Sequence, residues 1–209
     1  MTSPEDVVRR GYDAIADRYA EWAASFESPA MRWVEKLEQR LPERSRVLDL
    51  GCGGGGPATR ALAARHELVG VDISERQLER ARRLVPNARF VRADATEVAF
   101  EPESFDAVVS LFMLGHVPRA KQRPLLRRIL GWLRPGGWLL GMLGTADADD
   151  EVDPDWLGAP MFFASYDEAA NRESLEAAGF ALEEARVVPF EEPGHGLVRF
   201  MWVLARKPE

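Results

Sequence analysis

A short apolar run that ends in a cluster of glycines constrains the fold of this chain more than any other stretch. It reads Val47-Leu48-Asp49-Leu50-Gly51-Cys52-Gly53-Gly54-Gly55-Gly56, and a helical pattern begins at Pro57. A buried strand that turns through glycines into a helix lets the backbone approach a ligand closely and directs free N–H groups toward it. The sequence therefore predicts a ligand-binding α/β unit here.

Short apolar runs and helical patterns alternate from residue 46 to residue 143. The predicted strands are 47–50, 68–72, 89–91, 105–111 and 138–143. The predicted helices are 57–66, 74–84 and 119–133, with Pro124 marking the first turn of the last one. This alternation is typical of a parallel sheet with right-handed crossovers.

Both ends of the chain depart from this alternation. Two helices, one starting near Ser3 and one over 29–41, precede the first strand, and a helix over 168–178 closes at Gly179. Two strands follow, over 181–190 and 197–205, and the short connection between them allows only an antiparallel hairpin. The expected fold is an α/β, Rossmann-like seven-stranded sheet with helices on both faces, in which six strands are parallel and the C-terminal strand is antiparallel.

Composition limits the partners of the chain. The 209 residues suffice for one α/β domain, and 27 basic against 34 acidic side chains give a net charge of −7, which disfavours nucleic acid. No apolar stretch has the length of a membrane span, and the N-terminus lacks a signal-peptide pattern. The single cysteine and the scattered histidines predict no disulfide and no metal site. We expect a cytoplasmic monomer or homodimer.

The glycine cluster also satisfies a dinucleotide-binding pattern. Gly51, Gly53 and Gly56 match G-x-G-x-x-G, and Asp72 follows about 20 residues later, where that pattern places a ribose-binding acid. Asp49 argues against a nicotinamide cofactor, because a carboxylate just before the glycines would repel a pyrophosphate. A cationic ligand suits that position, so a dehydrogenase is the least favoured alternative.

Five segments in order resemble the motifs of class I S-adenosylmethionine (SAM)-dependent methyltransferases of the small-molecule type. They span residues 47–55, 69–74, 91–95, 105–110 and 133–140. The resemblance implies an enzyme that binds SAM and releases S-adenosylhomocysteine (SAH). It also implies one domain over 1–209, made of an N-terminal helical lid (1–45), a SAM-binding core (46–143), a substrate-cover insertion and helix (144–180) and a C-terminal hairpin (181–209).

The same resemblance assigns cofactor contacts. Asp72 holds the ribose hydroxyls, Asp94 accepts from the adenine amino group, and Tyr12 and Tyr19 of the lid helix close over SAM. The two tyrosines also share a helix face with Ile15, so core packing is an alternative that can hold at the same time. The expected cofactor-binding residues are Tyr12, Tyr19, Asp49, Gly51, Cys52, Gly53, Asp72, Ile73, Gln77, Asp94, Ala95 and Leu111.

Three segments are expected to reach the methyl acceptor, because ligands of open α/β sheets lie beyond the carboxyl ends of the strands. His116 follows the fourth strand and is a candidate general base, or a histidine that fixes its loop by hydrogen bonds. Residues 147–166 read as a long irregular segment that covers the substrate or packs in the core. The turn after the sixth strand is the third segment. The expected substrate-binding residues are Phe112, His116, Trp156, Phe162, Tyr166, Glu191 and His195.

The expected activity is transfer of a methyl group by in-line displacement to an oxygen or nitrogen nucleophile of a small molecule. A methyltransferase acting on RNA or protein and a non-catalytic SAM-binding module are the alternatives. The Asn-Pro-Pro-Tyr-like signature of nucleic-acid and amide methylators is missing after the fourth strand, where the chain reads Ser110-Leu111-Phe112-Met113.

The assignment of Asp72 predicts the effect of removing its carboxylate. Asp72→Ala should weaken SAM binding by about 1.5–3 kcal/mol, because it deletes a charge-assisted pair of ribose contacts. Isothermal titration calorimetry measures the affinity, and circular dichroism checks that the variant folds. Unchanged SAM affinity in a folded Asp72→Ala protein would rule out the ribose-binding role.

Overall fold

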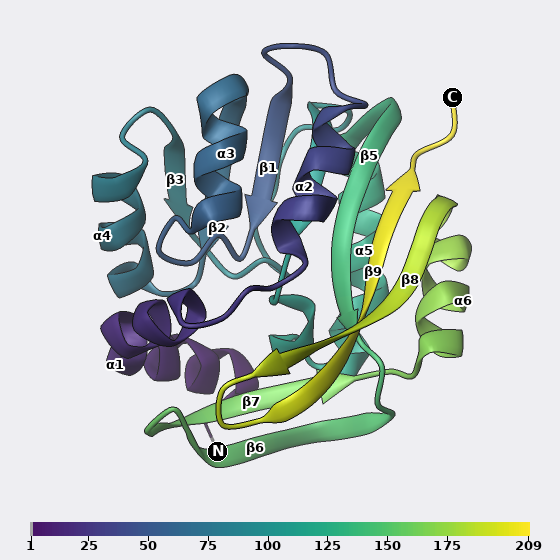
Figure 1. Cartoon of the computed structure of the whole chain (residues 1–209). Coiled ribbons are helices and arrows are strands. Elements are labelled where there is room, and N and C mark those ends of the chain that lie inside the picture. The colour runs from purple at the N-terminus through teal and green to yellow at the C-terminus, as the bar shows by residue number, and fades with distance from the viewer. Residues whose placement is uncertain (1) are drawn as a thin grey trace.

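A central seven-stranded sheet in the order β3-β2-β1-β4-β5-β9-β8 carries the fold of this chain, whose computed structural model describes residues 2–209 (Figure 1). Its strands are β1 (Arg46–Leu50), β2 (Glu67–Asp72), β3 (Arg89–Arg92), β4 (Phe105–Ser110), β5 (Leu133–Gly144), β8 (Ala181–Glu192) and β9 (Gly196–Arg206). Pairing is parallel from β3 to β5 and antiparallel on both sides of β9. The predicted Rossmann-like seven-stranded architecture is confirmed, as a mixed sheet.

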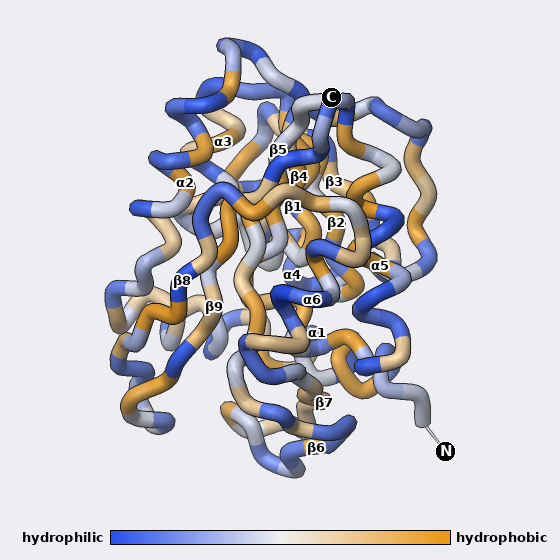
Figure 2. Tube along the Cα trace, turned by 90° about the vertical axis from the view of Figure 1, so that its right-hand side faces the viewer, coloured by the Kyte–Doolittle hydropathy of each residue, from blue (hydrophilic) through white to orange (hydrophobic). Residues whose placement is uncertain are grey.

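Helices cover both faces of this sheet because its buried strands are apolar on both faces. Val47 and Val109 pack with α2 (Ala30–Glu38) and α3 (Pro57–Arg65), whereas Leu48 and Val108 pack with α5 (Arg119–Trp132) and α6 (Glu168–Ala178). α4 (Glu75–Leu84) lies beside β2 and β3. Figure 2 shows the hydrophobic residues of β1 and β4 enclosed in the interior. Successive side chains of β1 and β4 thus point to opposite faces of the sheet. This alternation fixes the register of the central strands.

A third layer crosses the carboxyl ends of the parallel strands. It consists of α1 (Pro4–Ala24) and a two-stranded sheet of β6 (Ala148–Trp156) and β7 (Ala159–Ser165), which lie together at one end of the molecule (Figure 1). Val8 and Ile15 of α1 pack against Met161 and Phe162 of β7. The layer therefore has a small hydrophobic core of its own at the carboxyl ends of the parallel strands.

Two predictions of local structure were wrong. Residues 147–166 form the β6–β7 hairpin rather than an irregular segment, because Met161 and Phe162 are buried against α1 while the acidic side chains of β6 remain exposed. Pro124 lies inside α5, which begins at Arg119, so the helix forgoes the hydrogen bond that residue 124 would donate to the Ala120 carbonyl.

The close approach of α1 to β7 depends on a glycine. A Cβ at Gly11 would lie 2.7 Å from both the Met161 Cε atom and the Pro160 carbonyl oxygen. Distances this short force a backbone or side-chain shift, since the carbonyl oxygen cannot rotate away. Gly11 therefore sets how tightly the third layer packs.

We expect Gly11→Ala to lower the free energy of unfolding by about 1–3 kcal/mol, through overpacking between α1 and β7. Urea unfolding measures the change. Gly131→Ala in α5 is the matched control: its Cβ would meet open space, so helix propensity should stabilise that variant by about 0.4–1 kcal/mol. A Gly11→Ala protein as stable as Gly131→Ala would contradict the packing argument.

Candidate functional site

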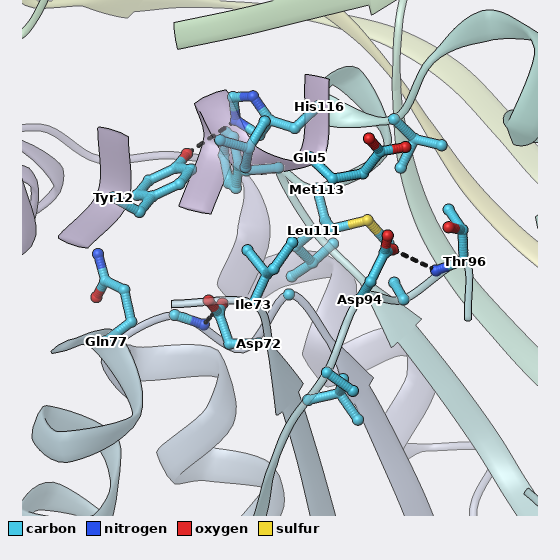
Figure 3. Close-up of a pocket in the computed structure, with 18 of the residues that line it drawn as sticks. Glu5, Tyr12, Asp72, Ile73, Gln77, Asp94, Thr96, Leu111, Met113 and His116 are labelled. Atoms are coloured by element: carbon cyan, nitrogen blue, oxygen red, sulfur yellow. Dashed lines mark hydrogen bonds between the residues drawn. The ribbon is translucent and has the colours of Figure 1, made fainter. Parts of the chain in front are cut away.

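A pocket of about 710 Å³ opens at the carboxyl ends of β1, β2 and β4, beneath α1 (Figure 3). Most residues predicted to bind the cofactor line it, namely Tyr12, Tyr19, Gly51, Gly53, Asp72, Ile73, Gln77, Asp94, Ala95 and Leu111. The sequence analysis missed eight further lining residues, Glu5, Val8, Val71, Ala93, Thr96, Met113, Val117 and Pro118. The missed residues are mainly apolar. Val71 and Ala93 lie within the motif segments 69–74 and 91–95 but were not assigned as contacts, and the other six lie outside the five motif segments.

The glycine turn after β1 is fixed by the end of β2. Gly51 and Gly53 adopt φ values of 76° and 52°, a region that side chains disfavour. A Cβ on Gly51 would also lie 2.5 Å from the Met113 Cβ. The Gly51 and Cys52 N–H groups donate to the Val71 carbonyl at 2.8 and 3.1 Å. The turn can therefore approach a ligand closely while remaining anchored to the sheet.

Asp72 stands at the floor of the pocket and organises the loops around it. Its carboxylate accepts hydrogen bonds from the Gly53 N–H at 2.8 Å and from the Ser74 N–H at 2.9 Å. Burial raises the pKa of Asp72 to about 6, and the two backbone bonds oppose that rise. Each oxygen accepts one backbone bond and keeps a lone pair free, so hydroxyl donors of a ligand could be held here.

A polar side chain without a partner faces the same space. The Gln77 Nε2 atom is buried and has no hydrogen-bond partner among the described residues. Figure 3 shows its amide between Asp72 and Tyr12. Since buried donors are almost always satisfied, this atom fits a ligand that supplies an acceptor. At the far side of the pocket, Asp94 accepts from the Thr96 N–H at 2.7 Å (Figure 3).

Asp49 and Cys52 do not line the pocket, which corrects two of the predicted contacts. Asp49 lies beneath the glycine turn and accepts from the Thr59 hydroxyl at 2.8 Å. The Cys52 side chain points to Gly70 and its N–H is used by Val71. Burial raises the pKa of the Cys52 thiol well above its ordinary value, so it is a poor nucleophile.

His116 is held by hydrogen bonds at both ring nitrogens. Its Nδ1 lies 2.9 Å from the Phe162 carbonyl oxygen, which can only accept, so Nδ1 carries the proton. The Tyr12 hydroxyl then donates to Nε2 at 2.8 Å. Burial lowers the pKa of His116 to about 4, which keeps the ring neutral at neutral pH. Its role in fixing the loop is thus visible, and general-base catalysis stays a prediction that requires the Tyr12 bond to open.

Only some of the residues predicted to contact the acceptor line the pocket. Phe112 and His116 line the pocket. Trp156 packs above it, with ring centroids 5.9 Å from those of Tyr12 and Tyr19. Phe162 is buried between α1 and the sheet and offers only its carbonyl. Tyr166 does not belong to the site, because its ring lies under the Arg119 guanidinium, 4.2 Å away, and its hydroxyl donates to the Arg119 carbonyl.

The β8–β9 turn, which was predicted to reach the methyl acceptor, contacts α1. The Trp22 indole N–H donates to the Pro193 carbonyl at 2.9 Å, and the ring centroids of Trp22 and His195 are 6.1 Å apart. His195 itself is exposed. Glu191 is exposed as well and does not face the pocket, whereas the neighbouring Glu192 is buried. Alternation with the buried Phe190 indicates that Glu192 rather than Glu191 points inward, a signal that the sequence analysis did not use.

Known proteins with similar sequences were found for most of the chain. A family model described as "Methyltransferase domain" matches residues 47–137. The chain is 36% identical, over 66% of its length, to 27-O-demethylrifamycin SV methyltransferase of Amycolatopsis mediterranei. It is 39% identical, over 77% of its length, to trans-aconitate 2-methyltransferase of Pseudomonas aeruginosa. It spans 59% and 52% of these two relatives.

A solved structure shares the whole fold. It is the Burkholderia thailandensis 1,6-didemethyltoxoflavin-N1-methyltransferase with bound 1,6-didemethyltoxoflavin and SAH, with a TM-score of 0.75 and 22% identity over 100% of this chain and 92% of that chain. Among residues 2–209, every helix falls short of the length and apolar character that a membrane crossing requires.

The buried carboxyl of Asp49 predicts a pH-dependent stability. Burial raises its pKa to about 7, while the Thr59 hydroxyl opposes the rise. The folded state therefore binds the Asp49 proton more tightly than the unfolded state, so this contribution is full below about pH 4 and is lost as pH rises toward 7. Asp49→Asn should match the wild type near pH 4 and exceed its free energy of unfolding at pH 7 by on the order of 1–4 kcal/mol.

Urea unfolding of both proteins across this pH range measures the difference. Glu151→Gln, which changes an exposed carboxylate of β6, should show no such divergence. A difference between Asp49→Asn and wild type that does not grow with pH would contradict the raised pKa.

Proposed function

Because the chain belongs to the class I SAM-dependent methyltransferase family, we propose that it transfers the methyl group of SAM to an oxygen or nitrogen nucleophile of a small molecule. The observation that carries this proposal is the pocket beneath α1, where Asp72, the unpartnered Gln77 amide and Asp94 meet the glycine turn.

The residues present fit the cofactor that the family implies. Asp72 would hold ribose hydroxyls through its free lone pairs, and Gln77 Nε2 would donate to a neighbouring oxygen. Asp94 would accept from the adenine amino group, and the Gly51 and Gly53 backbone would lie against the methionine part. Asp49, buried beneath the turn, would place negative charge near a cationic ligand. Bound SAM supplies a methyl group already activated for displacement by its sulfonium.

The chain's own contribution is alignment and exclusion of water. Tyr12 and Tyr19 on α1 close the pocket above, and Trp156 packs on both rings. His116 could take a proton at Nε2 only after the Tyr12 hydroxyl releases that atom. In this proposal residues 1–45 act as a lid, 46–143 as the SAM-binding core, 144–180 as the substrate cover and 181–209 as the hairpin that completes the site.

Two observations favour a small acceptor over a macromolecule. The rifamycin and trans-aconitate relatives are named for small-molecule acceptors. The chain's net charge of −7 disfavours RNA. The proposed location is the cytoplasm, and the proposed state is a monomer or homodimer.

SAM and SAH should each raise the melting temperature, because a ligand that binds only the folded state stabilises it by about 2.7 kcal/mol at 100 times its Kd. Differential scanning fluorimetry tests this, with NADH as a control that should have no effect. Incubation with SAM and a panel of amines, phenols and alcohols should release SAH. Stabilisation by SAM without SAH release would support a non-catalytic module, and release only with tRNA or protein would contradict a small acceptor.

A further inference from the structure

Glu192, the last residue of β8, is a buried carboxylate without a partner. Its residue is 8% exposed, and among residues 2–209 its carboxylate takes part in no hydrogen bond or ion pair that the structure shows. Its oxygen atoms are not completely sealed from solvent, but partial burial without a counter-charge disfavours the ionised form and raises the pKa of Glu192. A ligand with a positive charge or N–H donors would compensate the negative charge of this carboxylate.

The strand alternation places this side chain on the same face of β8 as Phe190, which packs against a pocket residue. Along β8, Phe190 and Glu192 are buried whereas Glu191 between them is exposed, so the two buried side chains share one face. The Phe190 ring lies 6.4 Å from the ring of Phe112, which lines the pocket. Glu192 therefore lies on the face of β8 that borders the pocket.

The pKa shifts of the α1 tyrosines also indicate that Glu192 lies near the pocket. Burial raises the pKa of the Tyr12 and Tyr19 hydroxyls, and the negative charge of Glu192 adds to the rise in both. Both tyrosines line the pocket. Glu192 thus acts electrostatically on two walls of the site although it belongs to a segment far away in the sequence.

The turn that follows Glu192 lies against an aromatic cluster, because the Trp22 indole N–H donates to the carbonyl of Pro193, the next residue. The Trp22 ring lies 5.9 Å from those of Tyr19 and Trp156 and 4.9 Å from that of Phe26. Aromatic faces attract cations, and a carboxylate binds N–H groups strongly. The pocket lining contains the carboxylates of Glu5, Asp72 and Asp94 and no lysine or arginine. No lining side chain would therefore supply a positive charge to an anionic acceptor.

We propose that Glu192 binds the methyl acceptor and that this acceptor is a small amine. The inference rests on the proposed methyl transfer and deepens it. The N–H groups of the amine donate to the Glu192 carboxylate, and its carbon skeleton packs on the aromatic rings. In the transfer, the unprotonated nitrogen forms a bond to the methyl carbon, the carbon–sulfur bond breaks with its electron pair left on sulfur, and one nitrogen proton passes through Glu192 to water.

A binding experiment with three probes of equal skeleton tests this assignment. Phenethylamine, 2-phenylethanol and phenylacetate are titrated into the SAH complex while tryptophan fluorescence is recorded. The amine should bind about tenfold or more tightly than the alcohol, as a charge-assisted bond predicts, and phenylacetate should bind weakest. Glu192→Gln should abolish the preference for the amine, and Glu191→Gln, one residue away on the exposed face, should retain it.

The melting temperature of the ligand-free protein gives a second readout. If the carboxylate serves a ligand rather than the fold, Glu192→Gln should raise the melting temperature, by about 2–4 °C for each kcal/mol of removed penalty. A lower melting temperature in Glu192→Gln would mean that the carboxylate stabilises the fold, and the proposal would be overturned.

The outcomes distinguish a failure of the Glu192 assignment from a failure of the proposed methyl transfer. SAH binding to wild type and Glu192→Gln with equal affinity shows that the cofactor site is intact. Equal or tighter binding of the alcohol or phenylacetate, absence of amine binding, or loss of the preference in Glu191→Gln would then overturn the role of Glu192 alone. Failure of SAH to bind the wild type would overturn both.

Discussion

The hydrogen bond from the Gly53 N–H to the Asp72 carboxylate joins the two loops on which the site depends. It spans 2.8 Å and connects the turn after β1 with the end of β2. The other oxygen of Asp72 accepts from Ser74, whose hydroxyl caps α4 and also donates to Asp13 of α1 at 2.6 Å. A single carboxylate therefore orders the glycine turn directly and reaches the helix above the pocket through one serine.

This arrangement makes the third layer a part of the site rather than an appendage. α1 is fixed at Asp13 to α4, at Gly11 to β7 and at Trp22 to the β8–β9 turn. The Tyr12 hydroxyl and the Phe162 carbonyl hold His116 from two sides. Movement of α1 away from the sheet would break its bonds to Ser74, Pro193 and His116, whereas the bond between His116 and Phe162 does not involve α1. Opening of the pocket therefore requires several bonds of α1 to break at once.

The sequence contained the core of this site because its signals are local. The glycine turn and the aspartate at the end of β2 belong to a short local pattern that predicted Asp72, whereas Asp94 and Gln77 were assigned through the resemblance to the family motifs. The β6–β7 hairpin and Pro124 inside α5 were not predicted, since tertiary packing against α1 and against the sheet overrides local preference there.

The acceptor side was harder to predict for the same physical reason. Tyr166 follows an aromatic run and resembled a cover residue, yet an arginine from another element stacks on it. Glu191 and Glu192 are chemically identical neighbours, and only the direction of the strand decides which of them is buried. The side of β8 to which each glutamate points depends on the pairing of β8 with β9. The amino-acid composition of the turn between the two strands does not reveal this pairing.

The exposed border of β6 has a consequence for how this chain behaves at high concentration. β6 pairs only with β7 among the described strands, so its other side presents unpaired backbone groups that could recruit a strand from another molecule. Asp149, Asp150 and Glu151 are exposed along it, and Pro154 removes one donor. Like charges on two such borders repel each other, so the acidic run disfavours edge-to-edge pairing of two molecules.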